Sequence, residues 1–427
     1  MNPTTQFSKL WHKYFTDYGK IEKAVINVII AEFFIQLINV AFLSIQLIYM
    51  QKCGYSDYES AGYISFRFLG VLLLAVPMGM YLKGRNIKPL FVISCIVVPT
   101  ASVMIILATM YHWNEWLYFY QLLWGMGFTF IQTPVLPYIL RNCEKRTQTS
   151  AIALSYSTYS FGGIISGVFV YVLYALNPVI FSERNLLLAL SLLSFAGIYF
   201  LQKVNSHEMV PREVEARKKK WSDYDWNIII RGLIPTLIIA VGAGLTIPFI
   251  GIFFFNVHHV STGSFSLLNG IASILVAISA MLVPFIKKSI GYKIAIPATQ
   301  SFAVLALVLL ATTQFYAQLS IALYIAILCF MLRQPLMNMA GPMTSELVMK
   351  YTGKRNQEMV SALTAAIWSG SWFISSLIFK LLRSSSWSYV YIFLITAFLY
   401  GIGVVWYYYL ILDYNKRQKL GLISEQD

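Results

Sequence analysis

Charged residues are scarce in this sequence. They make up 12% of the 427 residues, whereas hydrophobic residues make up 58%, and the mean hydropathy is +0.65. An ordinary soluble domain is roughly a quarter charged and about half apolar. A chain of this composition cannot place its apolar surface inside a water-soluble core, so we expect lipid to surround it.

Cysteine is scarce as well, and motifs of common catalytic and metal sites are missing. The four cysteines contain no CxxC pair, so neither a disulfide framework nor a zinc site is predicted. The sequence also lacks GxxxxGK[ST], HExxH and GxSxG, which are motifs of nucleotide-binding proteins, metalloproteases and serine hydrolases. We therefore expect no catalytic residues, no cofactor and no metal, and we do not expect an enzyme.

Long apolar segments are the main feature of the sequence. Each has about the 20 residues that a helix needs to cross a hydrocarbon layer, and each is too long and too uniformly apolar for a barrel strand. A lipid-exposed backbone must satisfy its own hydrogen bonds, so we predict an all-α integral membrane protein with twelve transmembrane helices. The segments are 24–50, 61–82, 89–110, 117–140, 150–174, 185–203, 228–254, 265–286, 294–312, 319–343, 359–381 and 389–412.

One long polar stretch, residues 204–227, divides these segments into two sets of six. We predict two pseudo-symmetric six-helix bundles, over residues 24–203 and 228–412, joined by this stretch as a linker. Residues 1–23 are predicted to form an interfacial segment, and residues 413–427 a tail.

Lysine and arginine are placed unevenly along the chain. The two termini, the linker and alternate connections contain 25 of the 32 lysines and arginines. Basic residues mark the cytoplasmic side of a membrane protein, so both termini and the linker are predicted to be cytoplasmic. The net charge of +14 thus indicates topology and not a nucleic-acid partner. The outer loops contain no N-x-[ST] glycosylation acceptor, which fits a multi-pass protein of the cell (inner) membrane.

The two halves match at corresponding places. Residues 130–134 (FIQTP) align with residues 331–335 (MLRQP), and residues 149–152 (TSAI) align with residues 360–363 (VSAL). Together with the equal segment counts, these matches indicate a duplicated six-helix unit. With six plus six helices, both ends inside and a basic central loop, the chain resembles the major facilitator superfamily (MFS) of secondary transporters over essentially its whole length.

The resemblance also implies a cytoplasmic gate. Residues 79–88 (GMYLKGRNIK) keep the first glycine and the last basic residue of the family's loop motif but have Lys83 where the family has an acid, and residues 287–293 (KKSIGYK) are the closer counterpart. In the family, acids and bases of the next cytoplasmic loops latch the outward-open state. The gate residues implied here are Gly79, Lys83, Arg85, Glu144, Arg146, Lys288, Gly291, Glu346 and Arg355.

Polar residues inside the apolar segments are the candidates for function. A charge at bilayer depth costs on the order of 3 kcal/mol, so each one needs a partner or a hydrated cavity. Glu32, Gln36, Asn39 and Gln46 lie on one face of the first helix, and we expect that face to line a cavity. Two interpretations of Glu32 remain open: a protonation switch that couples protons to transport, and a permanently paired structural acid.

Two arginines also fall inside apolar segments. Arg333 is predicted at nearly the depth of Glu32, so the two can pair, whereas Arg67 lies roughly 12 Å further out. Either arginine can contact an anionic substrate or tie helices together. Aromatic and small hydroxyl residues at helical spacing can form a pocket, although they also mediate helix packing. The predicted cavity residues are Gln36, Asn39, Arg67, Gln121, Gln132, Tyr159, Arg333, Gln334, Trp368 and Trp372.

Taken together, these features predict a secondary active transporter that moves a small amphipathic or anionic organic solute by alternating access, with proton-coupled efflux as the favoured direction. Proton-coupled uptake of a sugar, peptide or organic acid is the first alternative, and a lipid transporter or scramblase is the second. The expected partners are a small-molecule substrate, protons and membrane lipids, with no nucleic acid, and the chain is expected to be a monomer.

Overall fold

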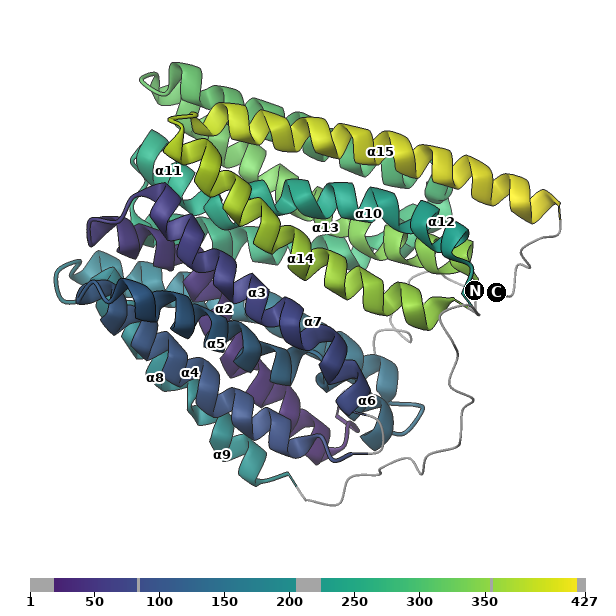
Figure 1. Cartoon of the computed structure of the whole chain (residues 1–427), viewed down its shortest axis with the longest axis horizontal. Coiled ribbons are helices and arrows are strands. Elements are labelled where there is room, and N and C mark those ends of the chain that lie inside the picture. The colour runs from purple at the N-terminus through teal and green to yellow at the C-terminus, as the bar shows by residue number, and fades with distance from the viewer. Residues whose placement is uncertain (1–18, 83–84, 205–223, 354–355, 421–427) are drawn as a thin grey trace, which may run out of the picture.

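The computed structural model describes residues 19–82, 85–204, 224–353 and 356–420, and the regular elements in these ranges are helices. They form two bundles side by side, the first drawn in purple to teal and the second in teal-green to yellow (Figure 1). The helices of the first bundle are α2 (Lys23–Lys52), α3 (Asp57–Tyr81), α4 (Lys88–Met110), α5 (Asn114–Gln132), α6 (Val135–Asn142), α7 (Gln148–Leu176), α8 (Glu183–Ser194) and α9 (Ala196–Gln202).

The second bundle follows the linker. Its elements are α10 (Trp226–Thr246), the 3₁₀ turn η2 (Ile247–Phe249), α11 (Ile250–His258), α12 (Thr262–Thr312), the 3₁₀ turn η3 (Thr313–Tyr316), α13 (Ser320–Thr352), α14 (Gln357–Ser384) and α15 (Tyr389–Lys419). We call the end of the bundles where Val204 and Tyr224 flank the linker the linker end. The other end, where α2 ends and α3 begins, is called the far end.

All twelve predicted segments fall on helices. The described ranges contain eleven helices that are long and apolar enough to cross a membrane. The remaining segment, 117–140, is formed by α5 and α6, which are separated at Thr133 and Pro134. Proline lacks the N–H that would continue the hydrogen-bond ladder, and this explains the break.

Several other spans are interrupted. The sixth divides at Phe195 into α8 and α9, and the seventh passes through η2 at Pro248 between α10 and α11. Helix α12 contains two predicted segments, 265–286 and 294–312, which are separated at Gly291. Gly291 has a φ of 68°, a conformation that glycine adopts without the steric penalty of a side chain. The predicted gate residue Gly291 is therefore the turn between two spans.

Two helices extend beyond their apolar segments at the linker end. Helix α13 continues to Thr352, past the predicted end at 343, and α15 continues to Lys419, past 412. Hydropathy marks where lipid ends, but backbone hydrogen bonds and polar side chains continue a helix in water. Here the Tyr351 hydroxyl of α13 donates a hydrogen bond to Asp413 of α15 at 2.7 Å, which ties the two extensions together, and Arg417 of α15 donates another to Asp413 at 2.9 Å.

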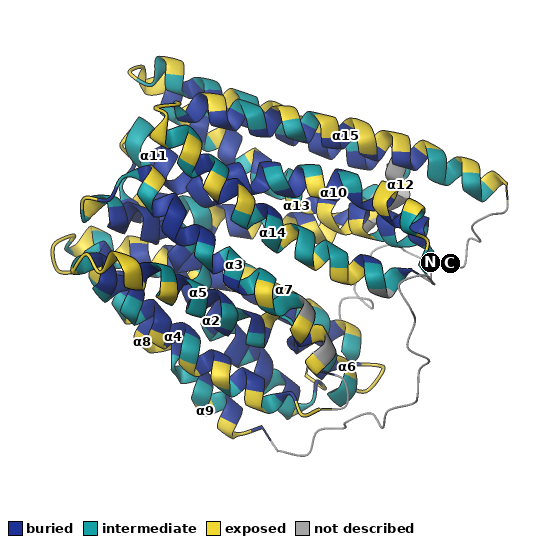
Figure 2. Ribbon diagram, viewed as in Figure 1, coloured by how far each residue is buried: buried dark blue, intermediate teal, exposed yellow. Residues whose placement is uncertain are grey.

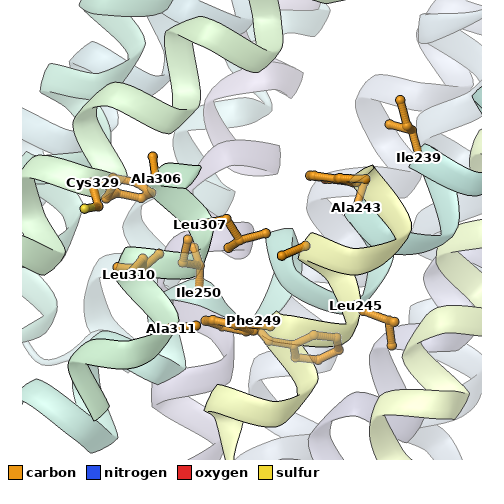
Figure 3. Packing of buried hydrophobic residues seen from close by; sticks show 14 of the residues in the cluster. Ile239, Ala243, Leu245, Phe249, Ile250, Ala306, Leu307, Leu310, Ala311 and Cys329 are labelled. Atoms are coloured by element: carbon orange, nitrogen blue, oxygen red, sulfur yellow. The ribbon is translucent and has the colours of Figure 1, made fainter. Parts of the chain in front are cut away.

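Each bundle has its own apolar core, and the second core reaches across to the first bundle. Figure 3 shows Phe249, Ile250, Leu307 and Ala311 within the core of the second bundle. Leu47, Ala61 and Ile64, which belong to α2 and α3 of the first bundle, join the same cluster. Figure 2 shows many buried residues where the two bundles meet. The bundles are thus packed against each other through α2 and α3.

Helices α3 and α5 approach closely at Gly125. A Cβ atom at Gly125 would lie only 1.9 Å from the carbonyl oxygen of Arg67, so the backbones touch where a side chain is absent. Small residues permit this kind of approach between membrane helices. The contact places Gln121 and Trp124 of α5 beside the Arg67 side chain.

We predict that Gly125→Ala lowers the apparent unfolding temperature of the purified protein in detergent. The added methyl group must push α3 away from α5, and overpacking of this kind costs about 1 to 3 kcal/mol. The matched control is Gly401→Ala in α15, where a Cβ would meet nothing within 4 Å. This control is expected to leave the unfolding temperature unchanged or slightly raised, and equal effects of the two substitutions would contradict the close packing.

Candidate transport cavity

Two adjoining cavities lie between the bundles. One of about 600 Å³, which we call the N-lobe, is lined mainly by α2, α3, α5, α6 and α7. The other, of about 880 Å³, is called the C-lobe and is lined mainly by α7, α10, α12 and α13, with two residues of α15. Tyr156, Tyr159 and Trp368 line both lobes, so the lobes meet at these aromatic side chains. Each lobe alone has the size of a small-molecule binding site.

The predicted polar face of the first helix lines the N-lobe. Glu32, Gln36 and Asn39 are wall residues, and the Asn39 amide donates a hydrogen bond to Gln36 at 3.0 Å. The Glu32 side chain is 6% exposed and accepts a hydrogen bond from the Ser155 hydroxyl at 2.6 Å. No ion pair joins Glu32 to a basic residue within the described ranges. Glu32 is thus a nearly buried acid held by a neutral partner.

Arg67 also lines the N-lobe, and hydrogen bonds and aromatic rings of the first bundle hold its side chain. Its Nε and Nη2 atoms donate hydrogen bonds to the side-chain oxygen of Gln121 at 3.1 and 2.9 Å, and Nη2 also donates to Gln46. The guanidinium lies over the rings of Trp124 and Phe42, at 4.3 and 5.4 Å from their centroids. Amide oxygens and aromatic faces both stabilise a cation. Arg67 is therefore held through its Nε and Nη2 atoms and through two aromatic rings.

The prediction that Gln121 lines the cavity is wrong. Gln121 is fully buried and belongs to neither lobe, because its side chain points to Arg67 at the contact of α5 with α3. Helical spacing placed it on a polar stripe but not on the correct side of the helix. The predicted residues that do lie in the cavity walls are Gln36, Asn39, Arg67, Gln132, Tyr159, Arg333, Gln334, Trp368 and Trp372.

Arg333 lies in the wall of the C-lobe and is only 1% exposed. Its Nη2 atom donates a hydrogen bond to the Tyr400 hydroxyl at 3.3 Å, and its Nε has no hydrogen-bond partner among the described residues. Gln300, in the same wall, has a buried side-chain oxygen that likewise lacks a partner in this part of the chain. The predicted pairing of Glu32 with Arg333 is not formed, since the two residues line different lobes.

An ionic network closes the cavity at the far end. Asp57 of α3 accepts hydrogen bonds from Nη2 and Nε of Arg383 of α14, at 2.7 and 3.1 Å, and also from the hydroxyl of Tyr389. A second acid, Glu183, accepts from Lys52 at 2.7 Å and from Thr262 of α12 at 2.6 Å. Each acid thus links the first bundle to the second.

Asp57 and Glu183 were not predicted from the sequence. Both acids begin helices at the edge of the membrane region, outside the deep apolar positions where a charge is unusual. The useful signal was the presence of Lys52, Arg184, Lys380 and Arg383 in the connections on the other side, because Lys52 and Arg383 need acidic partners.

Close helix packing completes the closure at the far end. A Cβ at Gly163 would lie 2.3 Å from the Ser273 hydroxyl, and one at Gly167 would lie 2.5 Å from the Ser266 carbonyl oxygen, so α7 and α12 touch directly. On the other side of the interface, the rings of Phe68 and Trp372 meet edge to face, with centroids 5.0 Å apart. The lobes are therefore sealed from the far end.

The lobes extend instead toward the linker end. Their walls include Ala153 near the start of α7 and Met349 near the end of α13, and both of these helix ends lie at the linker end. The N-lobe is also lined by Val135 and Ile139 of α6. The arrangement, closed at the far end and reaching the linker end, is that of a carrier facing one side of the membrane.

The described gate residues make contacts inside their own bundles. The Arg85 carbonyl accepts a hydrogen bond from Arg141 at 2.9 Å, and Glu346 forms an ion pair with Lys350 at 3.2 Å. Gly79 and Arg146 are exposed. Lys83 and Arg355, together with the side chain of Lys288, lie outside the described residues.

Glu144 is held through its backbone. Its N–H donates a hydrogen bond to the Glu22 carboxylate at 2.8 Å, at the start of α2. Burial opposes ionisation of Glu22, but hydrogen bonds from the backbone of Glu144, the side chain of Cys143, its own backbone and the side chain of Thr147 together outweigh burial and lower the pKa of Glu22 below its usual range. The loop between α6 and α7 is thus fastened to the first bundle by a charged acid.

A family model for the Major Facilitator Superfamily matches residues 33–376. The chain belongs to this superfamily. The predicted recognition as an MFS secondary transporter is therefore confirmed, and the location in a membrane follows from it.

Solved MFS structures share the fold over nearly the whole chain. The D-xylose-proton symporter matches with a TM-score of 0.73 and 12% identity, covering 90% of this chain and 96% of that one. A bacterial homologue of the iron transporter ferroportin in the inward-facing state matches with a TM-score of 0.71 and 12% identity, covering 91% and 98%. A POT family transporter in complex with a thioalcohol conjugated peptide matches with a TM-score of 0.70 and 11% identity, covering 92% and 96%.

These identities show the fold alone, and they confirm the predicted all-α MFS architecture with twelve membrane helices. The named transporters carry unlike solutes, so the fold does not select a substrate. No curated protein sequence matches the chain.

We predict that Asp57→Asn releases the far end. The amide cannot neutralise Arg383, and breaking a buried ion pair costs roughly 3 kcal/mol or more, which shifts the equilibrium toward opening at that end. The measurement is the distance between spin labels on Glu115→Cys and Ser385→Cys, two exposed far-end positions on different bundles, with the native cysteines replaced by serine. The distribution is expected to gain a longer component.

The matched control for this experiment is Glu59→Gln. Glu59 lies two residues beyond Asp57 in α3, and its carboxylate accepts hydrogen bonds from Ser56 in its own turn. This variant is expected to keep the distribution of the unsubstituted protein. If Asp57→Asn also left the distribution unchanged, the ionic network would not hold the far end closed.

Proposed function

We propose that this MFS protein is a proton-coupled secondary transporter that moves a small amphipathic or anionic organic solute by alternating access. The observation that carries the proposal is Glu32, a nearly buried acid in the cavity wall whose hydrogen-bond partner, Ser155, is neutral. A permanently paired structural acid would have a basic partner, and none is found within the described ranges.

The position of Glu32 suits a proton switch. An ionised carboxylate away from water is costly, and uptake of a proton removes that cost. When the cavity is hydrated the carboxylate can be charged, whereas closure of the bundles around it favours the neutral form. Proton binding at Glu32 would therefore govern whether the bundles can close over the cavity.

The cavity walls suit a solute with apolar and polar parts. Trp124, Phe128, Trp368 and Trp372 supply aromatic surface in the N-lobe. The C-lobe adds polar groups such as Gln334. A pocket of mostly apolar surface with a few placed polar groups fixes both the affinity and the orientation of a small molecule.

The placement of basic residues supports a cytoplasmic linker end. Described basic residues such as Lys88, Arg141 and Lys416 lie at the linker end, whereas Lys52 and Arg383 at the far end are neutralised by Glu183 and Asp57. By the positive-inside rule, the cavity of this conformation would then reach the cytoplasm of a cell whose inner membrane holds the protein.

The geometry of the cavity also bears on the direction of solute transport. A proton and a substrate that compete for one site exchange with each other, which drives efflux, but separate sites allow both to be carried together. Glu32 lines the N-lobe, so a solute held in the C-lobe would not displace its proton. We therefore favour proton-coupled uptake, and efflux, which the aromatic walls suggested from sequence, is the second candidate.

We predict that Glu32→Gln abolishes proton-driven accumulation but keeps exchange. The amide has the shape of the protonated acid and cannot release a proton, so the accumulation ratio in proteoliposomes with an imposed pH gradient is expected to fall to about one. Counterflow of a solute that the unsubstituted protein accumulates should be retained. The polarity of the gradient that drives accumulation distinguishes uptake from efflux.

Glu115→Gln is the control, since Glu115 is an exposed acid at the far end of α5. It should leave accumulation unchanged. Normal accumulation by Glu32→Gln would remove Glu32 from the mechanism, and lipid movement without dependence on the gradient would favour a scramblase.

A further inference from the structure

Arg333 is the least satisfied buried charge described in the structure. It is 1% exposed, its Nε lacks a hydrogen-bond partner among the described residues, and its hydrogen bond to Tyr400 is long at 3.3 Å. No acid forms an ion pair with it within the described ranges. A guanidinium has five donors and is always charged, so this environment leaves most of its binding capacity unused.

Arg67 is a second buried arginine of the same protein, and it has more protein partners than Arg333. Its donors reach the side-chain oxygens of Gln46 and Gln121, and two aromatic rings cover its faces. From the sequence, either arginine was an equally good candidate for an anion ligand. The structure separates them, because Arg67 makes three hydrogen bonds to two amide oxygens, whereas Arg333 makes one long hydrogen bond and has a buried Nε without a partner among the described residues.

The groups around Arg333 form one side of a binding site. Tyr400 accepts the hydrogen bond of Arg333, so its own hydroxyl hydrogen remains available to a further acceptor. Gln300 presents a buried side-chain oxygen without a partner in the described ranges, and Thr236 and Tyr407 complete this wall of the C-lobe. Two donors, Nε of Arg333 and the Tyr400 hydroxyl, thus lack an acceptor among the described residues, and the Gln300 oxygen lacks a donor there.

We propose that Arg333 is the substrate-anion ligand of this transporter. The oxyanion of the solute, a carboxylate or a phosphate, binds Arg333 and the Tyr400 hydroxyl in the C-lobe. The apolar body of the solute lies toward Tyr159 and Trp368, where the two lobes meet. This inference rests on the proposed transport function and names its substrate class as amphipathic organic anions. Arg67 is a positioning residue that holds α2, α3 and α5 together.

The test is thermal unfolding of the purified full-length protein in detergent with defined probes. Phenylacetate and phenyl phosphate are expected to raise the unfolding temperature, and the neutral phenylacetamide is not. Arg333→Gln should weaken the apparent affinity for phenylacetate at least about tenfold, because charge-assisted bonds to an oxyanion are lost. In the absence of probe, this variant should be as stable as the unsubstituted protein or more stable, since an uncompensated buried charge has been removed.

Arg67→Gln is the matched control variant. It should lower the unfolding temperature without probe and keep the selectivity for phenylacetate over phenylacetamide. A third arm adds phosphatidylglycerol to the micelles. If this lipid raises the unfolding temperature of the unsubstituted protein but not of Arg333→Gln, the oxyanion that binds Arg333 belongs to a bilayer lipid. If phenylacetate raises the temperature and the lipid does not, the oxyanion belongs to a water-soluble acid.

Either of two results would overturn the inference. One is equal stabilisation of the unsubstituted protein and Arg333→Gln by the anionic probes. The other is the absence of anion-selective stabilisation in the unsubstituted protein with all three oxyanions. Proton-driven accumulation of a neutral solute in proteoliposomes would still support the proposed function, so a failure of the anion site is distinguishable from a failure of the transporter.

Discussion

The cost of placing charge away from water is the constraint on which the arrangement of this protein depends. The described structure meets that cost in three ways. At the far end, Asp57 meets Arg383 across the interface, and Glu183 meets Lys52 of its own bundle. Arg67 is surrounded by neutral oxygens and aromatic rings. Neither Glu32 nor Arg333 has its charge fully compensated by protein partners. Both lie in cavity walls, where water, a proton or a solute can supply the missing compensation.

The two ends of the interface are held by different kinds of contact. At the far end, directional ionic bonds and the touching helices α7 and α12 link one bundle to the other. At the linker end, Arg85, Glu144 and Glu346 contact residues of their own bundles. Water can replace polar contacts such as those at the far end without exposing the apolar core of either bundle. Such an interface can therefore open while each bundle keeps its internal packing.

Sequence reasoning succeeded where lipid imposes a simple rule and failed where the answer depends on a neighbouring helix. Segment length and hydropathy located the spans, and helical spacing placed Glu32, Gln36 and Asn39 on the cavity side. The same spacing placed Gln121 wrongly, because period alone does not say which side of α5 meets α3. Counting residues gave Glu32 and Arg333 similar depths, but depth does not determine whether two helices bring their side chains together across a cavity.

The separation of Glu32 from Arg333 suggests why a carrier of this design would couple two solutes. Each residue lies in the wall of a different lobe, and each carries a charge that closure would strip of water. A proton on Glu32 removes one charge, and an oxyanion on Arg333 compensates the other, so occupancy of both sites lowers the cost of closure more than occupancy of either one. A carrier that closes readily only when both charges are compensated must move the proton and the anion in the same direction. Coupling would then follow from electrostatics alone, without direct contact between the two binding residues.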